Sequence, residues 1–114
     1  MGSETLHEKR DALKKETIDL HRAIVSLVEE LEAVDWYNQR VDVATDPELA
    51  DILAHNRDEE KEHAAMLMEW IRRHDEAFAD EMTDYLPTEK PAPAPEAPQR
   101  RAPPPPPARP HAPP

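Results

Sequence analysis

Apolar residues recur every three or four positions along the first part of the chain. No glycine or proline interrupts this pattern from about Lys9 to Val41, and the spacing is that of one face of an α-helix. The pattern therefore predicts one long amphipathic helix. The apolar positions that define its face are Leu13, Leu20, Ile24, Leu27, Leu31, Val34 and Val41.

A second long helix is predicted from Pro47 to about Arg73. Its start carries two competing signals, because Thr45 and Glu48 have capping-box spacing while Asp46 offers an N-cap directly before a proline. Only a few residues then separate the two helices, so they should fold back on each other as an antiparallel hairpin. The buried stripe of this second helix is marked by Leu49, Ile52, Leu53, Leu67, Trp70 and Ile71.

A short third helix is predicted from about Asp75 to Tyr85. It should end there because Pro87 forbids its continuation. Of the 14 prolines in the chain, 13 lie between Pro87 and Pro114. We therefore expect a helical domain over residues 1–86 and a disordered, Pro-rich tail over residues 87–114 with polyproline II character. The tail contains Pro-x-x-Pro spacings near arginines that suit an SH3-like groove, although a flexible tether is the more common role.

The predicted helical domain is strongly acidic, with 23 acidic and 10 basic residues and a net charge of −13. This charge opposes binding to nucleic acid and favours attraction of cations. The chain has no cysteine, which excludes thiolate metal sites and iron–sulfur clusters. No apolar run has the length of a membrane span or signal peptide, so we expect an intracellular protein without a membrane partner.

The stripe of the second helix is interrupted by polar residues at its centre. Between Leu53 and Leu67, steps of three and four pass through Asn56, Glu60 and His63, and a break in an apolar pattern is often functional. Glu30 lies on the corresponding face of the first helix, and it is nearly as far from the predicted turn as Glu60 is. A hairpin should bring the three titratable side chains to the same height, where they form half of a carboxylate di-iron site.

Local spacing alone leaves an alternative open. Glu4 and His7 also have Glu-x-x-His spacing at the start of the chain, where no site is expected. Glu30, if buried, needs a partner, and a base across the hairpin such as Arg57 or Lys61 would serve as well as a metal ion. A bound metal and a salt bridge are both compatible with the spacing.

The stretch from His21 to Arg73 resembles a known family. It reads HRAIVSLVEELEAVDWYNQRVDVATDPELADILAHNRDEEKEHAAMLMEWIRR, and the segments EELEAVDWY and HNRDEEKEHA carry a strong resemblance to the encapsulated ferritins. These are bacterial ferritin-like proteins held inside encapsulin nanocompartments in the cytoplasm. The resemblance implies an all-α, two-helix protomer that completes a ferritin-like four-helix bundle by dimerisation, and a ring of five dimers.

The resemblance also implies roles for individual residues. It places iron ligands on both helices, a tyrosine beside the iron centre and an accessory metal site near Trp36. The ligands would be Glu30, Glu60 and His63, the tyrosine Tyr37, and the accessory residues Glu29 and Glu32. Calcium or zinc ions would be occupants of accessory or competing sites.

The function implied is that of a ferroxidase, which oxidises Fe(II) to Fe(III) with dioxygen at a di-iron site shared by two chains and supplies iron for storage. Nothing after Pro87 matches the targeting peptide of the family, so an encapsulin shell is an expected partner only where such a peptide is present. Two alternatives stay open on the residues alone. One is a metal-free helical interaction module with a partner-binding tail, and the other is a related di-iron peroxidase or oxygenase.

Overall fold

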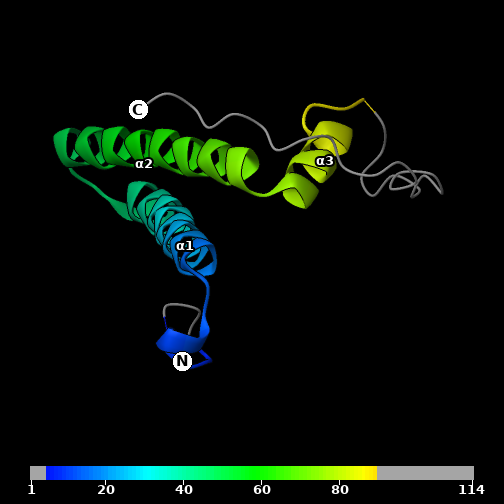
Figure 1. The fold of residues 1–114 in the computed structure, drawn as a ribbon. Helices are drawn as coiled ribbons and strands as arrows, with labels where there is room; N and C mark the ends of the chain where they lie inside the picture. The colour runs from blue at the N-terminus through cyan, green and yellow to red at the C-terminus, as the bar shows by residue number, and fades with distance from the viewer. Residues whose placement is uncertain (1–4, 90–114) are drawn as a thin grey trace. The chain divides into compact units, whose positions relative to one another are not determined.

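The computed structural model describes residues 5–89, and the regular elements among them are all helical. A 3₁₀ turn, Arg10–Ala12, precedes three α-helices: α1 (Lys15–Val43), α2 (Pro47–His74) and α3 (Glu76–Tyr85) (Figure 1). The all-α class and the sequence of two long helices and a short one are thereby confirmed. Most of the predicted Pro-rich tail, and Glu4, lie outside the described residues. Within those residues, no helix combines the length and the hydropathy needed to cross a membrane.

Helix α1 begins later than its apolar pattern predicted. The backbone at Leu13 and Lys14 is extended, and Lys14 occupies the N-cap position without a capping hydrogen bond from its side chain. The expected start near Lys9 was wrong because the apolar spacing identifies a helix face but does not locate its end. No Ser, Thr, Asp or Asn caps this helix, and such a residue would have been the sequence signal for the start.

The connection between α1 and α2 consists of residues 44–46 and decides between the two predicted caps. The side chain of Asp46 accepts a hydrogen bond of 2.8 Å from the backbone N–H of Leu49. Asp46 is therefore the N-cap, with Pro47 at the first helical position, where its missing N–H costs no hydrogen bond. Thr45 does not fill this role.

The two long helices form an antiparallel hairpin. Arg57, near the middle of α2, donates a hydrogen bond to Asn38 of α1. His63, farther from the connection along α2, lies beside Glu30, which is farther from the connection along α1. Residues progressively more distant from the turn thus meet each other, as the short connection predicted.

The chain divides into two compact units, and the hairpin up to Trp70 is the first. Its buried apolar residues are Ile18, Ala23 and Ala64, of which two are small. Several large apolar side chains of the hairpin are instead about half exposed, with 52% for Leu31, 53% for Ile52 and 58% for Met66. A single copy of the hairpin therefore leaves much of its apolar surface in contact with water.

The second unit begins at Ile71 and contains the end of α2 and helix α3. Asp75 caps α3, because its carboxylate accepts a hydrogen bond of 2.9 Å from the backbone N–H of Phe78. Ile71 and Ala79 are buried. The start of α3 thus agrees to within one residue with its prediction.

Candidate metal centre

Glu30, Glu60 and His63 come together in the hairpin. Glu30 comes from α1, and Glu60 and His63 lie one turn apart on α2. One potential ligand atom from each of the three lies within 4.8 Å of the others. The hairpin therefore brings the three residues to the same height, and we refer to them as the site cluster.

The imidazole of His63 lies beside the carboxylates of both helices in this cluster. Its Nδ1 lies 2.9 Å from Oε1 of Glu60 and 3.6 Å from Oε1 of Glu30. The two glutamate side chains are largely covered, with 26% of Glu30 and 24% of Glu60 exposed, while His63 is 42% exposed.

The two carboxylates are close enough to compete for one proton. A hydrogen bond to Glu60, together with burial and the negative charge of Glu60, raises the pKa of Glu30. Hydrogen bonds from Glu30 and His63 lower the pKa of Glu60. A hydrogen bond to Glu60 also raises the pKa of His63, and the charges of both glutamates act in the same direction. In the protein without metal, protons shared among these groups thus offset the repulsion between the two carboxylates. A bound cation would offset the same repulsion in their place.

The two bases that were weighed as partners for Glu30 across the hairpin, Arg57 and Lys61, pair elsewhere, and the base that lies beside Glu30 is His63. Arg57 donates to Asn38 and Asp58, and Lys61 pairs with Asp58 at 3.2 Å. Arg57 has a long side chain that can reach acceptors in several directions, so its spacing along the chain did not decide which one it meets. Among the described residues, the contacts of the site carboxylates are with each other and with His63.

The other residues singled out by the sequence lie on α1 outside this cluster. Glu29 and Glu32 are both exposed, and Trp36, at 51% exposure, lies four residues beyond Glu32. Tyr37 is half-buried, and the guanidinium of Arg40 lies 5.3 Å from the centre of its ring. An accessory metal site at the exposed glutamates, and a role for Tyr37 beside the centre, stay predictions.

Sequence reasoning missed a contact that Asn38 makes across the hairpin. Asn38 accepts a hydrogen bond from Arg57 at 3.0 Å across the hairpin. A polar residue one position after Tyr37 carries no recognisable motif, so composition and spacing offered no signal. The only available signal was its distance from the connection, which limits the part of α2 that it can contact.

The donor set of the site cluster suits particular metals. Two carboxylates and one imidazole match iron and manganese, which accept oxygen and nitrogen ligands together. In ferritin-like bundles a di-iron centre is built from a glutamate on each of two helices and a Glu-x-x-His pair on each of two others. One chain supplies one glutamate from α1 and one Glu-x-x-His pair from α2, which is half of that set.

Comparison with known proteins places this arrangement in a family. The sequence profile of the family described as EncFtn-like matches residues 5–89. An encapsulated ferritin-like protein from Rhodospirillum rubrum is 63% identical over 96 residues, which span 84% of this chain and 69% of the relative. A ferritin-like protein from Thermotoga maritima is 49% identical over 85 residues, which span 75% of each chain.

The fold also matches a solved structure. A crystal structure of a protein from Nitrosomonas europaea superimposes with a TM-score of 0.75 and shares 64% sequence identity. The match covers 78% of this chain and 98% of the other. The helical arrangement is thus shared with an experimentally determined structure over most of the described residues.

Proposed function

This chain belongs to the encapsulated ferritin-like (EncFtn-like) family, and we propose that two copies of it form a ferroxidase centre that oxidises Fe(II) with dioxygen. The observation that carries the proposal is the site cluster itself. Glu30, Glu60 and His63 lie within 4.8 Å of one another and constitute half of a ferritin-like di-iron ligand set. A second copy would supply the other half.

The apolar surface of the hairpin supports pairing of two chains. Leu31 directly follows Glu30 on α1, and Met66 lies one turn beyond His63 on α2; both are more than half exposed. Ile52 lies on the same stripe of α2, three turns before His63, and is also more than half exposed. Exposed apolar residues around the candidate ligands favour an interface there rather than a solvated face. Dimerisation would complete a four-helix bundle and enclose the metals in one step.

Iron is the substrate at this centre. Glu30 and Glu60 would bind Fe(II) through carboxylate oxygens and stabilise the more highly charged Fe(III), while His63 would supply one nitrogen ligand to each half. Two Fe(II) ions release two electrons, enough to reduce dioxygen to hydrogen peroxide when two protons are taken up. Binding of iron displaces the protons that the carboxylates and His63 hold in the metal-free protein.

The proposal extends to assembly and location. Five such dimers would form a ring, and residues 1–86 would be the folded domain with residues 87–114 as a Pro-rich tail outside it. The name of the Rhodospirillum rubrum relative supports delivery of iron to a store inside an encapsulin shell in the bacterial cytoplasm. Production of the chain together with an encapsulin, with and without an appended targeting peptide, tests the last point, which fails if neither form copurifies with the shell.

Iron oxidation by a single-residue variant tests the central proposal. Ferric absorbance after mixing with Fe(II) in air should rise at least about 100-fold more slowly in Glu60→Ala, because loss of a group that merely supports a ligand already costs roughly 10–100-fold. Glu62→Ala is the matched control, because Glu62 is exposed. It lies two residues after Glu60 on α2, so it is on another face of the helix, away from the cluster. Equal rates in Glu60→Ala and the parent would refute a ferroxidase role and favour a metal-free interaction module.

A further inference from the structure

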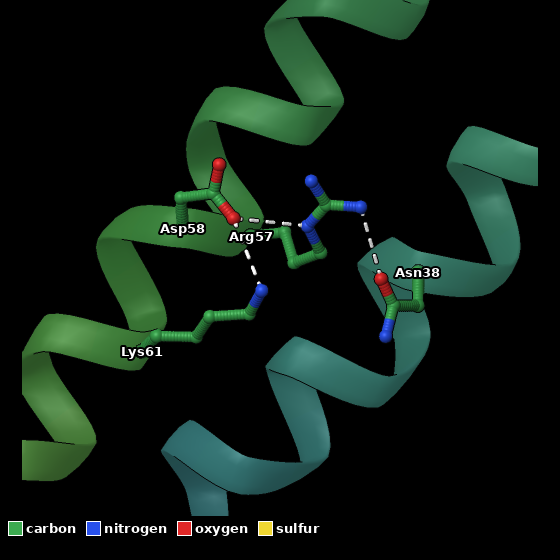
Figure 2. Close-up of polar contacts among 4 residues, drawn as sticks. All are labelled: Asn38, Arg57, Asp58 and Lys61. Carbon is green, nitrogen blue, oxygen red and sulfur yellow. Dashed lines mark hydrogen bonds and ion pairs between the residues drawn. The ribbon is translucent and has the colours of Figure 1, made fainter.

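Four polar residues form a second cluster on the hairpin, beside the site cluster. Arg57 donates to Oδ1 of Asn38 at 3.0 Å and to Oδ1 of Asp58 at 3.1 Å (Figure 2). Lys61 pairs with the same carboxylate oxygen of Asp58 at 3.2 Å. We refer to Asn38, Arg57, Asp58 and Lys61 as the clamp cluster.

The arginine of this cluster is held in place on both sides. Its side chain is 23% exposed, whereas those of Asp58 and Lys61 are more than half exposed. Figure 2 shows the guanidinium between the two helices, with the Asp58 carboxylate on one side and the Asn38 amide on the other. A planar guanidinium can satisfy two acceptors in fixed directions, which a lysine ammonium does less well. The clamp cluster therefore links α1 to α2 with a defined geometry.

The hydrogen bond between Arg57 and Asn38 lies close enough to the site cluster in sequence to affect the spacing of the candidate ligands. Arg57 lies three residues before Glu60 on α2, and Asn38 lies eight residues after Glu30 on α1. A slip of one residue between the helices would shift Glu30 along α2 by about 1.5 Å. Metal–ligand distances tolerate deviations of only about 0.2 Å. A hydrogen bond that fixes the register of the hairpin therefore acts on the spacing of the ligands.

The two bases of the clamp cluster pair with Asp58 and not with the site carboxylates. Arg57 and Lys61 flank Glu60 in sequence, and each is the kind of base that would neutralise a neighbouring carboxylate. Both pair with Asp58 instead. Neither base therefore neutralises Glu30 or Glu60 through a direct ion pair.

We propose that Asn38 and Arg57 act as positioning residues, which hold α1 and α2 in the register that the metal ligands require. The inference rests on the proposed function, because it concerns the affinity of the same site for metal. It assigns no ligand role to either residue. Its consequence is that a substitution outside the ligand set should weaken metal binding without unfolding the helices.

Titration of the whole protein with Co(II), followed by visible absorption, tests this inference. Co(II) is the probe because it accepts the same ligands as Fe(II) and its absorption reports coordination geometry. Asn38→Ala should weaken Co(II) binding about tenfold, as is found when groups that orient a ligand are lost. Circular dichroism should show the parental helical content.

Three further variants make the result specific to the clamp. Asn38→Asp keeps an acceptor for Arg57 and should restore affinity to near that of the parent. Arg57→Lys keeps the charge but cannot span both acceptors, so it should behave like Asn38→Ala. Gln39→Ala is the matched control, since Gln39 is the next residue, is exposed and bonds only within α1, to Asp35 at 3.1 Å.

The outcomes distinguish a failure of the positioning role from a failure of the proposed metal site. If the parent binds Co(II) and Asn38→Ala binds it as tightly as Gln39→Ala does, the positioning role is wrong while the proposed metal site stands. Parental affinity in Arg57→Lys, or no recovery in Asn38→Asp, overturns it as well. If the parent itself binds no Co(II) and no Fe(II), the proposed function fails and the positioning role fails with it.

Discussion

The two polar clusters of the hairpin differ in the balance of their charges. The clamp cluster contains two bases, one acid and one amide, and every donor that it uses meets an acceptor. The site cluster sets two carboxylates beside one imidazole, and the carboxylates raise and lower each other's pKa through a shared proton. The same two helices carry both. In the clamp cluster a hydrogen bond from a guanidinium to an amide joins the two helices, whereas in the site cluster like charges are held together and the proposed metal ion would complete the site.

The largest effect should come from disruption of the proposed interface between two chains, which would supply the second half of the site. Leu31→Asp would put a carboxylate on the exposed apolar surface beside Glu30, where pairing of two chains would bury it at a high cost. Dimers should dissociate and iron oxidation should fall to background together, as measured by native mass and ferric absorbance.

Gln39→Asp provides the control, since it adds the same charge to a polar exposed position of α1. It should retain both assembly and oxidation. Oxidation at the parental rate by a monomeric Leu31→Asp protein would show that the site cluster is complete within one chain.

A rise in pH through the raised pKa values should lower the stability of the metal-free protein and increase the stabilisation that metal provides. His63 has a raised pKa, so its contribution to stability is present below its ordinary value of 6.5 and is lost as pH rises through the raised value. Glu30, also with a raised pKa, adds a loss in the same direction once it ionises beside Glu60. Metal binding requires deprotonated ligands, so Co(II) should stabilise the protein more as pH rises.

Thermal denaturation over a pH series, with and without Co(II), measures this difference. Glu60 has a lowered pKa, and its contribution is instead lost as pH falls through that lowered value. The melting temperature of the metal-free protein should therefore fall toward high pH and also at strongly acidic pH. Parallel curves with and without metal would argue that the site cluster does not bind the ion.

A neutral substitution in the site cluster should stabilise the metal-free protein. Glu30→Gln removes the carboxylate whose ionisation is disfavoured and retains a side chain that can donate a hydrogen bond to Glu60. The free energy of unfolding should rise by roughly 0.5–2 kcal/mol, as is common where a substitution relieves a functional constraint. Chemical denaturation of the metal-free protein measures the gain, and oxidation assays should show loss of activity. A lower free energy of unfolding in Glu30→Gln would contradict the claim that the paired carboxylates of the site cluster destabilise the metal-free protein.

The smallest effect is expected at the rim of the clamp cluster. Lys61 is 55% exposed, and Asp58 would keep its ion pair with Arg57 if Lys61 were replaced. Exposed ion pairs contribute little to stability, so Lys61→Ala should leave both the melting temperature and Co(II) affinity close to those of the parent. A large loss in either would mean that the clamp depends on its exposed member.

Much of the hairpin follows from local patterns in the sequence. The spacing of Leu20, Leu27 and Val34 indicated the face of α1, and the Asp46-Pro47 pair indicated the start of α2. These signals are local, and the structure agrees with two long helices and with the start of α2. The predicted burial was wrong in part, because Ile24 and Leu31 of the α1 face and Leu49 and Ile52 of the α2 stripe are exposed in a single copy of the chain. The start of α1 did not follow, because no capping residue marks Lys15.

The site cluster was predictable to the extent that a hairpin with a short turn fixes which residues lie level. Glu30 and Glu60 were expected to meet for that reason, and they do. The choice of partner for Arg57 was not predictable, because its flexible side chain can reach Glu30, Asn38 or Asp58. Hydrogen-bond geometry in three dimensions decides among such acceptors, and linear spacing does not contain it.

Native mass spectrometry of the parent and of Glu60→Ala, each measured with and without Fe(II), tests the central claim most directly. It reports the number of chains and the number of bound iron ions in the same particle. A site shared between chains predicts two iron ions for every two chains in the parent, none in monomers, and loss of iron from Glu60→Ala. Iron bound tightly to single chains, or assembled parent protein that takes up no iron, would contradict it.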